Sequence, residues 1–184
     1  LVIAAGAEMR LLFPAALADA QVQPCRLQMM RTPPQPDGFD LGAVLVSDLT
    51  LCHYPAFRDC PSTPALRARL EAELPHHHDW GVHVIVAQHD DGSIVLGDSH
   101  EYGVDFAPES HAGVEGLILD AMAAFVTLPD PRIAARWTGT YLKSTIGQTQ
   151  VVLAPRERVT MVTAMGGLGM TLSWGLAERT VAAW

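Results

Sequence analysis

Apolar positions recur along this chain at two spacings, one typical of helices and the other typical of strands. Leucines at 66, 70 and 74 share one helical stripe, directly after the N-cap and first-turn signal of Thr63 and Pro64. A second helix is predicted over Val114–Phe125, where apolar residues again follow helical spacing. The pattern after the glycines at 166–169 predicts a third helix at the C-terminus.

Runs rich in β-branched and apolar residues predict the strands. Leu1–Ala5 reads as a buried strand that enters a turn at Gly6. Cys25–Arg31 is a strand candidate that prolines at 33, 34 and 36 would end. Segment 80–99 reads as a hairpin around Asp90-Asp91-Gly92. The remaining candidates are two short strands within 42–54 and one each within 132–142, 150–155 and 159–166.

Helices and strands alternate irregularly, so the order predicts an α+β or α/β fold with a strand–turn–helix unit at its end. The chain has 184 residues, 49% of them hydrophobic, which suffices for a sizeable core in one or two domains. The first 20 residues superficially resemble a signal peptide. However, they have no basic leading region, and Glu8 and Arg10 interrupt the apolar stretch. A strand inside a domain, with the chain beginning part-way through it, is the favoured interpretation.

Charge and cysteine content exclude several classes of partner. The net charge is −8 and Lys and Arg form no cluster, which argues against a nucleic-acid partner. No apolar run reaches the roughly 18 residues that a membrane span requires. Cys25, Cys52 and Cys60 are an odd set without metal-type spacing, as expected in a reducing cytoplasm.

Histidines are frequent between 76 and 100 and raise the question of a metal site. His76–His78 directly follow Pro75, where a solvated loop is the simpler interpretation. His83 and His89 share strand parity but would lie about 20 Å apart on an extended strand, too far for one ion. The sequence therefore favours no metal. The candidate ligands in this region are His76, His77, His78, His83, His89 and His100, with Asp79, Asp90 and Asp98.

Nucleophilic catalysis has still weaker support. The sequence has no G-x-S-x-G elbow, and Ser173 falls inside the last helical pattern. Nothing marks Cys52 or Cys60 as an activated thiolate, so each is expected to be a small buried apolar residue.

The stretch "MVTAMGGLGMTLSWGLAE", residues 161–178, carries a more specific signal. Glycine costs about 1 kcal/mol against alanine inside a helix, so three glycines here indicate a tight turn or a close approach. A strand, a glycine turn and a helix in this order direct backbone N–H groups toward an anion or a polarised oxygen. A tight turn without any ligand is the alternative.

Five motifs in order resemble one family: "LVIAAGAE", "PCRLQMMRT" with Gln28, "VIVAQHDDGSIVLGDSHEYG", "RWTGTYLKS" and "MGGLGMTLSWGLAE". Together they are similar to the C-terminal half of FAD-dependent amine oxidoreductases of the D-amino-acid oxidase, glycine oxidase and sarcosine oxidase superfamily. Within it the chain is most similar to the members associated with aminophosphonate breakdown. The resemblance implies that residues 1–22 end the first part of a Rossmann-like FAD-binding domain. Residues 23–138 would form a mixed-sheet substrate domain with flanking helices, and 139–184 would return to the FAD domain.

The resemblance also implies contacts with FAD. The N–H groups near Met170 and Thr171, with the helix dipole behind them, would face the pyrimidine edge of the flavin. No cysteine lies in the terminal motif or in the strand Trp137–Lys143, so the flavin would not be covalently attached. The implied cofactor-binding residues are Ala5, Gly6, Gly139, Gly166, Gly167, Gly169, Met170 and Thr171.

Two departures from the family change what is expected. The opening G-x-G-x-x-G, which would cradle the FAD pyrophosphate, is absent, so the chain is expected to be truncated and to hold FAD poorly. Glycine oxidase-like members carry a substrate-binding Arg where this sequence has Tyr141, with Lys143 two residues on. A simple amino-acid carboxylate is therefore not the expected group. The predicted substrate-binding residues are Tyr141, Lys143, His53, Tyr54 and Arg31.

The resemblance thus implies oxidation of a C–N bond in a small amine, an aminophosphonate or its N-methyl derivative, to an imine and then a carbonyl compound. No residue is assigned as a catalytic base. A non-catalytic binding module that keeps the substrate-domain fold is the alternative, and the missing nucleotide fingerprint favours it.

Overall fold

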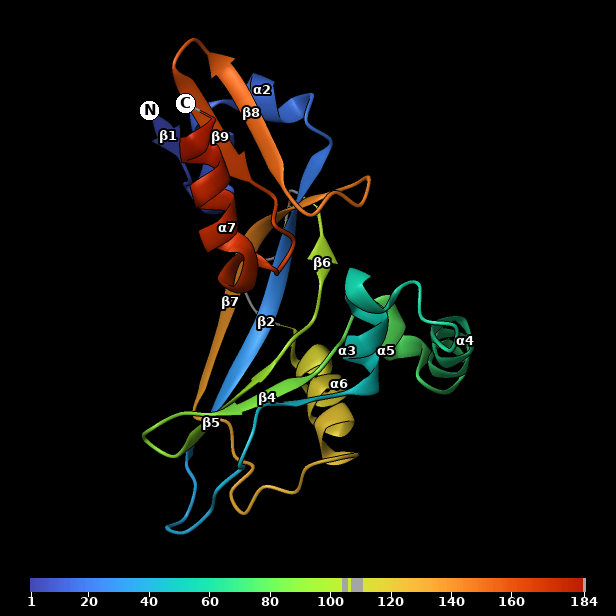
Figure 1. Ribbon diagram of the computed structural model, residues 1–184. Helices are drawn as coiled ribbons and strands as arrows, with labels where there is room; N and C mark the ends of the chain where they lie inside the picture. The colour runs from blue at the N-terminus through green and yellow to red at the C-terminus, as the bar shows by residue number, and fades with distance from the viewer. Residues whose placement is uncertain (104–105, 107–110, 184) are drawn as a thin grey trace. The chain divides into compact units, whose positions relative to one another are not determined.

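The computed structural model describes residues 1–103, 106 and 111–183 (Figure 1). The chain divides into two compact units. Unit 1 contains Leu1–Cys25, Tyr102–Asp105 and Thr140–Trp184, and unit 2 contains Arg26–Glu101 and Phe106–Gly139. Each unit has a hydrophobic core of its own, as described below.

Unit 1 is built on a sheet with the strand order β1-β9-β8. β1 (Val2–Ile3) runs parallel to β9 (Val159–Thr163), and β8 (Val151–Arg156) pairs antiparallel with β9. The helices are η1 (Gly6–Glu8), α1 (Met9–Leu12), α2 (Pro14–Ala18) and α7 (Gly169–Ala182). The core contains Met9, Leu17, Leu142, Val151, Met161 and Ala164.

Unit 2 is centred on an antiparallel hairpin of β4 (Ile85–Gln88) and β5 (Ser93–Gly97). The sheet has the order β3-β4-β5-β2-β6, and β7 (Ala135–Ser144) also pairs with β2. The other strands are β2 (Val22–Pro34), β3 (Leu45–Val46) and β6 (Glu101–Tyr102). The helices are α3 (Asp48–His53), η2 (Pro55–Phe57), α4 (Thr63–Glu73), α5 (Pro75–Asp79) and α6 (Ala112–Ala123).

The core of unit 2 lies between α6 and the hairpin (Figure 1). One stripe of α6, formed by Val114, Ile118 and Met122, is buried as its helical spacing predicts. It belongs to the same core cluster as Val86 and Leu96 on β4 and β5. Burial of this stripe is the main reason why the segment stays helical, because amphipathic packing outweighs intrinsic propensity.

The mixed α/β architecture confirms the predicted fold class. The hairpin around residues 90–92, α4, α6 and α7 lie where the sequence predicted them. β2 is longer than predicted and continues through Pro33 to Pro34. Its ladder with β5 shifts register between Arg31 and Pro34, and such a bulge accommodates residues that donate no backbone hydrogen bond.

The predicted burial of the strand Leu1–Ala5 is wrong, because β1 contains only Val2 and Ile3 and both Leu1 and Val2 are exposed. Two predicted element types are also wrong. Segment 42–54 forms one short strand, β3, and then the helix α3 instead of a second strand. The Oγ of Ser47 accepts the N–H of Val84 at 3.0 Å, and the hydroxyl of Thr50 donates to the Val84 carbonyl at 3.1 Å. These bonds to a neighbouring strand favour a helical turn between Ser47 and Thr50.

The second wrong element type is the solvated loop predicted at His76–His78, which is the helix α5. His77 is buried, and its Nε2 lies 3.0 Å from the carbonyl oxygen of Leu117. Across the described part of the chain, no helix combines the length and the apolar character that crossing a bilayer requires.

Candidate functional site

The glycine turn of residues 164–169 joins β9 to α7 and has an unusual backbone. Gly166 and Gly167 have φ values of +59° and +83°, in the left-handed region that favours glycine. Ala164 also has a positive φ, 57°. α7 begins directly afterwards at Gly169, with Leu168 as its N-cap. The sequence thus uses glycine where the chain reverses sharply before a helix N-terminus.

A cavity of about 600 Å³ lies within unit 1 between this turn, β1, β9 and α7. Five of the eight predicted cofactor-binding residues line it: Gly6, Gly166, Gly167, Gly169 and Met170. Ala5, Gly139 and Thr171 are not among its lining residues. The N–H of Thr171 donates to the carbonyl of Leu168 at 3.1 Å, so it serves the first turn of α7.

Tyr141 and Lys143 lie against the glycine turn. Lys143 bridges Met165 through the backbone, and Tyr141 lines the cavity. A Cβ on Gly167 would lie 3.6 Å from the Tyr141 hydroxyl, and one on Gly166 would lie 3.8 Å from Cγ of Lys143. The structure therefore brings together the predicted flavin-binding turn and two predicted substrate-binding residues.

The ammonium group of Lys143 has a partner that the sequence did not indicate. Its Nζ donates to the Tyr102 hydroxyl at 2.8 Å and lies 5.2 Å from the centre of the Tyr102 ring. Tyr102 ends β6 and is separated from Lys143 by 41 positions. The two residues belong to the motifs "EYG" and "YLKS", which no sequence spacing or periodicity connects, so the sequence carries no signal for this contact.

The other predicted substrate-binding residues lie in unit 2 at two separate places. Nε of Arg31 donates to Ser93 Oγ at 2.7 Å, and the guanidinium forms an ion pair with Asp91. Hydrogen bonds from Ser93, more than the charge of Arg31, hold the pKa of Asp91 below its usual value. These contacts are at the hairpin turn that precedes β5, whereas His53 lies near Asp98, which follows β5. The structure does not bring Arg31 to His53.

His53 belongs to a cluster of three histidines, His53, His83 and His100, in unit 2. The ring centres of His53 and His83 are 4.1 Å apart, and the edge of Tyr54 contacts His53 at 5.3 Å between centres. Burial, and next the charge of Asp98, raises the pKa of Tyr54. The sequence did not indicate this cluster, because His53, His83 and His100 lie on separate segments that spacing along a single strand does not bring together.

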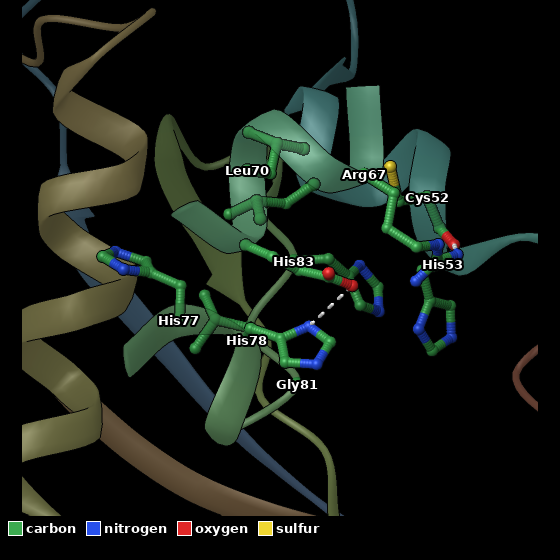
Figure 2. A pocket seen from close by; sticks show the side chains of 11 residues that line it. Cys52, His53, Arg67, Leu70, His77, His78, Gly81 and His83 are labelled. Atoms are coloured by element: carbon green, nitrogen blue, oxygen red, sulfur yellow. Dashed lines mark hydrogen bonds and ion pairs between the residues drawn. The ribbon is translucent and has the colours of Figure 1, made fainter. Parts of the chain in front are cut away.

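A second cavity, of about 280 Å³, borders this cluster (Figure 2). His53 and His83 line it together with Cys52 and the exposed His78 (Figure 2). Burial raises the pKa of the Cys52 thiol. The predicted burial is wrong for Cys60, which is exposed, and Cys52 is only partly buried. None of the three cysteines of the chain, all of them described, is in a disulfide.

Comparisons with known proteins agree with this architecture. The chain belongs to the FAD dependent oxidoreductase (DAO) family, whose profile matches residues 1–183. Among solved structures it is similar to the glycine oxidase of Geobacillus kaustophilus, with a TM-score of 0.56 and 15% identity. It is also similar to the glycine oxidase of Bacillus cereus, with a TM-score of 0.60 and 15% identity. The search of curated proteins gave no match.

The two matches cover 94% of this chain but only 37% and 38% of the glycine oxidase chains. The chain therefore spans less than half the length of these solved structures. At this level of identity they establish the fold and not the substrate.

FAD is the cofactor of the family, and the residues around the larger cavity fit a flavin ring. Backbone and apolar side chains of Val2, Val162 and Leu176 line it, as a flat conjugated ring system requires. Apart from its chain neighbours and the backbone of α7, no atom lies within 4 Å of the position that a Cβ on Gly169 would take, so the absent side chain leaves this space open. The aminophosphonate-associated subtype and the roles of individual residues have no comparable support and remain predictions.

Proposed function

We propose that the chain contributes the glycine turn and the substrate domain of a FAD-dependent oxidoreductase that oxidises a C–N bond of a small amine. The leading substrate class is an aminophosphonate or its N-methyl derivative. The single observation that carries the proposal is the position of Tyr141 and Lys143 against the glycine turn of the cavity. A substrate held by these two side chains would lie next to a ring bound in that cavity.

In this proposal FAD, when bound, supplies the acceptor for a hydride from the carbon next to the amine nitrogen. Unit 1 provides the surface that orients the ring, with Gly166, Gly167 and Gly169 allowing close approach. The substrate loses a hydride and a proton and becomes an imine, which water hydrolyses to a carbonyl compound and an amine.

Lys143 and Tyr102 favour a phosphonate over a carboxylate as the substrate's anionic group. Lys143 is the only lysine of the chain, and Tyr102 holds its ammonium group in place. An ammonium group and tyrosine hydroxyls suit the three acceptor oxygens of a phosphonate. A carboxylate is more often bound by the planar fork of an arginine.

The substitution Lys143→Met tests the proposal in the flavin-loaded oxidoreductase to which the chain contributes, because the 184-residue chain alone is expected to hold FAD poorly. We expect KM for aminomethylphosphonate to rise by roughly 10- to 150-fold, which corresponds to about 1.5–3 kcal/mol for one charge-assisted contact. Flavin content should not change, because the lysine head group is not needed to shape the turn. Initial rates at several substrate concentrations and the flavin absorbance of the purified protein measure both quantities.

Arg158→Met is the matched control, since it removes one fully exposed positive charge from the same unit. It should leave KM unchanged. An unchanged KM in Lys143→Met with normal flavin content would remove Lys143 from the substrate site. Faster anaerobic bleaching of the flavin by glycine than by aminomethylphosphonate would contradict the substrate class.

A further inference from the structure

We propose that His53, His83, His100 and Asp98 in unit 2 form a binding site for one divalent transition-metal ion, with Zn²⁺ as the best-suited ion. None of these residues lines the cavity of unit 1, and the site does not depend on the proposed redox function. It also revises the sequence-based interpretation, in which the spacing of the histidines along one strand argued against a metal site.

The side chains already lie close to the arrangement that an ion requires. One ligand atom from each histidine lies within 4.8 Å of the others. The ring centres are 4.1, 4.3 and 4.6 Å apart. Tetrahedral Zn²⁺ with Zn–N bonds of about 2.0–2.1 Å needs its ligand atoms roughly 3.3 Å apart. Nitrogens that are 4.8 Å apart would have to approach by about 1.5 Å. This requires the rings, whose planes are inclined by only 29°, 37° and 25° to one another, to turn from their stacked arrangement toward the ion.

Backbone hydrogen bonds hold two of the four groups opposite each other. His83 N–H donates to the Asp98 carbonyl at 3.0 Å, and Asp98 N–H donates to the His83 carbonyl at 2.7 Å. Residues that exchange both bonds in an antiparallel pair project their side chains to the same face of the sheet. This places His83 Nε2 3.0 Å from Asp98 Oδ1.

The second nitrogen of each buried ring faces an oxygen, as is usual for metal-bound histidines. Nδ1 of His100 lies 3.1 Å from the carbonyl oxygen of Gly81, which can only accept, so this nitrogen carries the proton. In the neutral ring the unprotonated nitrogen of His100 is then Nε2. Nδ1 of His83 faces the Thr50 hydroxyl oxygen at 3.5 Å, and that hydroxyl donates to the Val84 carbonyl at 3.1 Å.

The charges of the cluster favour a cation over an anion. The Asp98 carboxylate lies beside two of the imidazoles, those of His83 and His100, and would repel a phosphate or a phosphonate, but it can add a fourth ligand for a metal. Three imidazoles and one carboxylate are a donor set that suits Zn²⁺, and four protein ligands complete a tetrahedral, structural site. His53 lines the neighbouring cavity, which gives an ion a path to the cluster (Figure 2).

Calorimetric titration of the 184-residue chain with Zn²⁺, after removal of metals by a chelator, tests the site. We expect one ion per chain with a dissociation constant below micromolar, and a higher melting temperature with the ion bound. His83→Ala and His53→Ala should each weaken binding by about 100-fold or more, because each removes a direct ligand. Because His83 is only 3% exposed, its replacement can disturb folding. His53 lies at the cavity wall, so His53→Ala should fold and still tests the loss of one ligand.

His78→Ala and Cys52→Ser are the matched controls, since both side chains line the same cavity but are outside the cluster. Both should bind Zn²⁺ as the unchanged chain does, with circular dichroism to verify folding of every variant. Co²⁺ in place of Zn²⁺ should give the strong visible absorption of tetrahedral coordination. The proposal fails if the unchanged chain takes up no Zn²⁺, if folded His53→Ala binds it as tightly, or if His78→Ala or Cys52→Ser abolishes binding.

Discussion

Gly81 is the residue whose backbone sets the position of His100. Its φ is +54°, and a Cβ built on it would lie 2.9 Å from Cβ of His100 and 3.2 Å from its carbonyl oxygen. The carbonyl of Gly81 also accepts from the His100 ring. A side chain at position 81 would therefore be disfavoured by the left-handed backbone conformation. It would also clash with His100, a member of the histidine cluster.

We expect Gly81→Ala to lower the free energy of unfolding by more than Gly42→Ala does. Gly42 also has a positive φ, 73°, but open space surrounds its missing Cβ. The control therefore measures only the left-handed conformation, about 1–2 kcal/mol. The difference between the variants, measured by urea unfolding, isolates the contact with His100. Equal losses would show that His100 moves aside without cost.

At the level of residues, the sequence identified the glycine turn and missed the histidine cluster for physical reasons. Gly166 and Gly167 were predictable because positive φ angles leave a direct mark on residue choice. The cluster joins His53, at the end of α3, to residues before β4 and after β5. Proximity across such segments depends on hairpin register and helix placement, which local spacing does not encode.

Among the elements, those with a strong periodic pattern were predictable and α3 was not. α6 buries one regular stripe, so its pattern and its structure agree. Segment 48–53 is short and apolar, and short apolar runs are ambiguous between strand and helix. Hydrogen bonds from Ser47 and Thr50 to Val84 decide the case, and these tertiary contacts override local β propensity.

The contact between α6 and β7 predicts a pH dependence of stability. Arg136 bonds both carboxylate oxygens of Glu115, at 2.5 and 2.7 Å. The hydrogen bond from Arg136 lowers the pKa of Glu115 below its ordinary 4.5. A lowered pKa in the folded state means that the pair stabilises the protein above pH 4.5, and that this stabilisation is lost as the pH falls through the folded-state pKa.

Glu115→Gln should therefore lower the free energy of unfolding by about 0.5–1 kcal/mol at pH 7, the range for a partly exposed pair. The gap between the variant and the unchanged chain should close on acidification below pH 4.5. Denaturant unfolding at several pH values measures this difference in the free energy of unfolding. Asp120→Asn, which neutralises an exposed carboxylate on the same helix, is the control. A gap that persists in acid would assign the loss to packing instead of charge.

For the molecule as a whole, the family and the fold class followed from the sequence, whereas individual site contacts did not. Five motifs in order carried the family, and the matching profile over residues 1–183 agrees with it. The pairing of Lys143 with Tyr102 and the separation of Arg31 from His53 arise from how strands are arranged in space. Motif order is retained in a linear sequence, but such contacts appear only once the chain is folded.

The cavity of unit 1, where we propose that the flavin ring binds, leads to a prediction about the 184-residue chain itself. Its lining residues can contact the ring, but the sequence has no G-x-G-x-x-G for the pyrophosphate. We therefore expect weak binding of flavins, with dissociation constants for riboflavin and FAD less than about tenfold apart, or 1.4 kcal/mol. Quenching of flavin fluorescence on titration with the chain measures both constants.

Gly169→Val should abolish this binding, because its branched side chain would project into space that no other atom occupies within 4 Å. The same open space means that the substitution should not disturb the fold of the chain itself. Gly175→Val, on the same helix and equally unobstructed but outside the cavity lining, should bind riboflavin normally. Retained binding in Gly169→Val would place the flavin elsewhere. FAD bound a hundredfold more tightly than riboflavin would show that other residues of this chain hold the pyrophosphate.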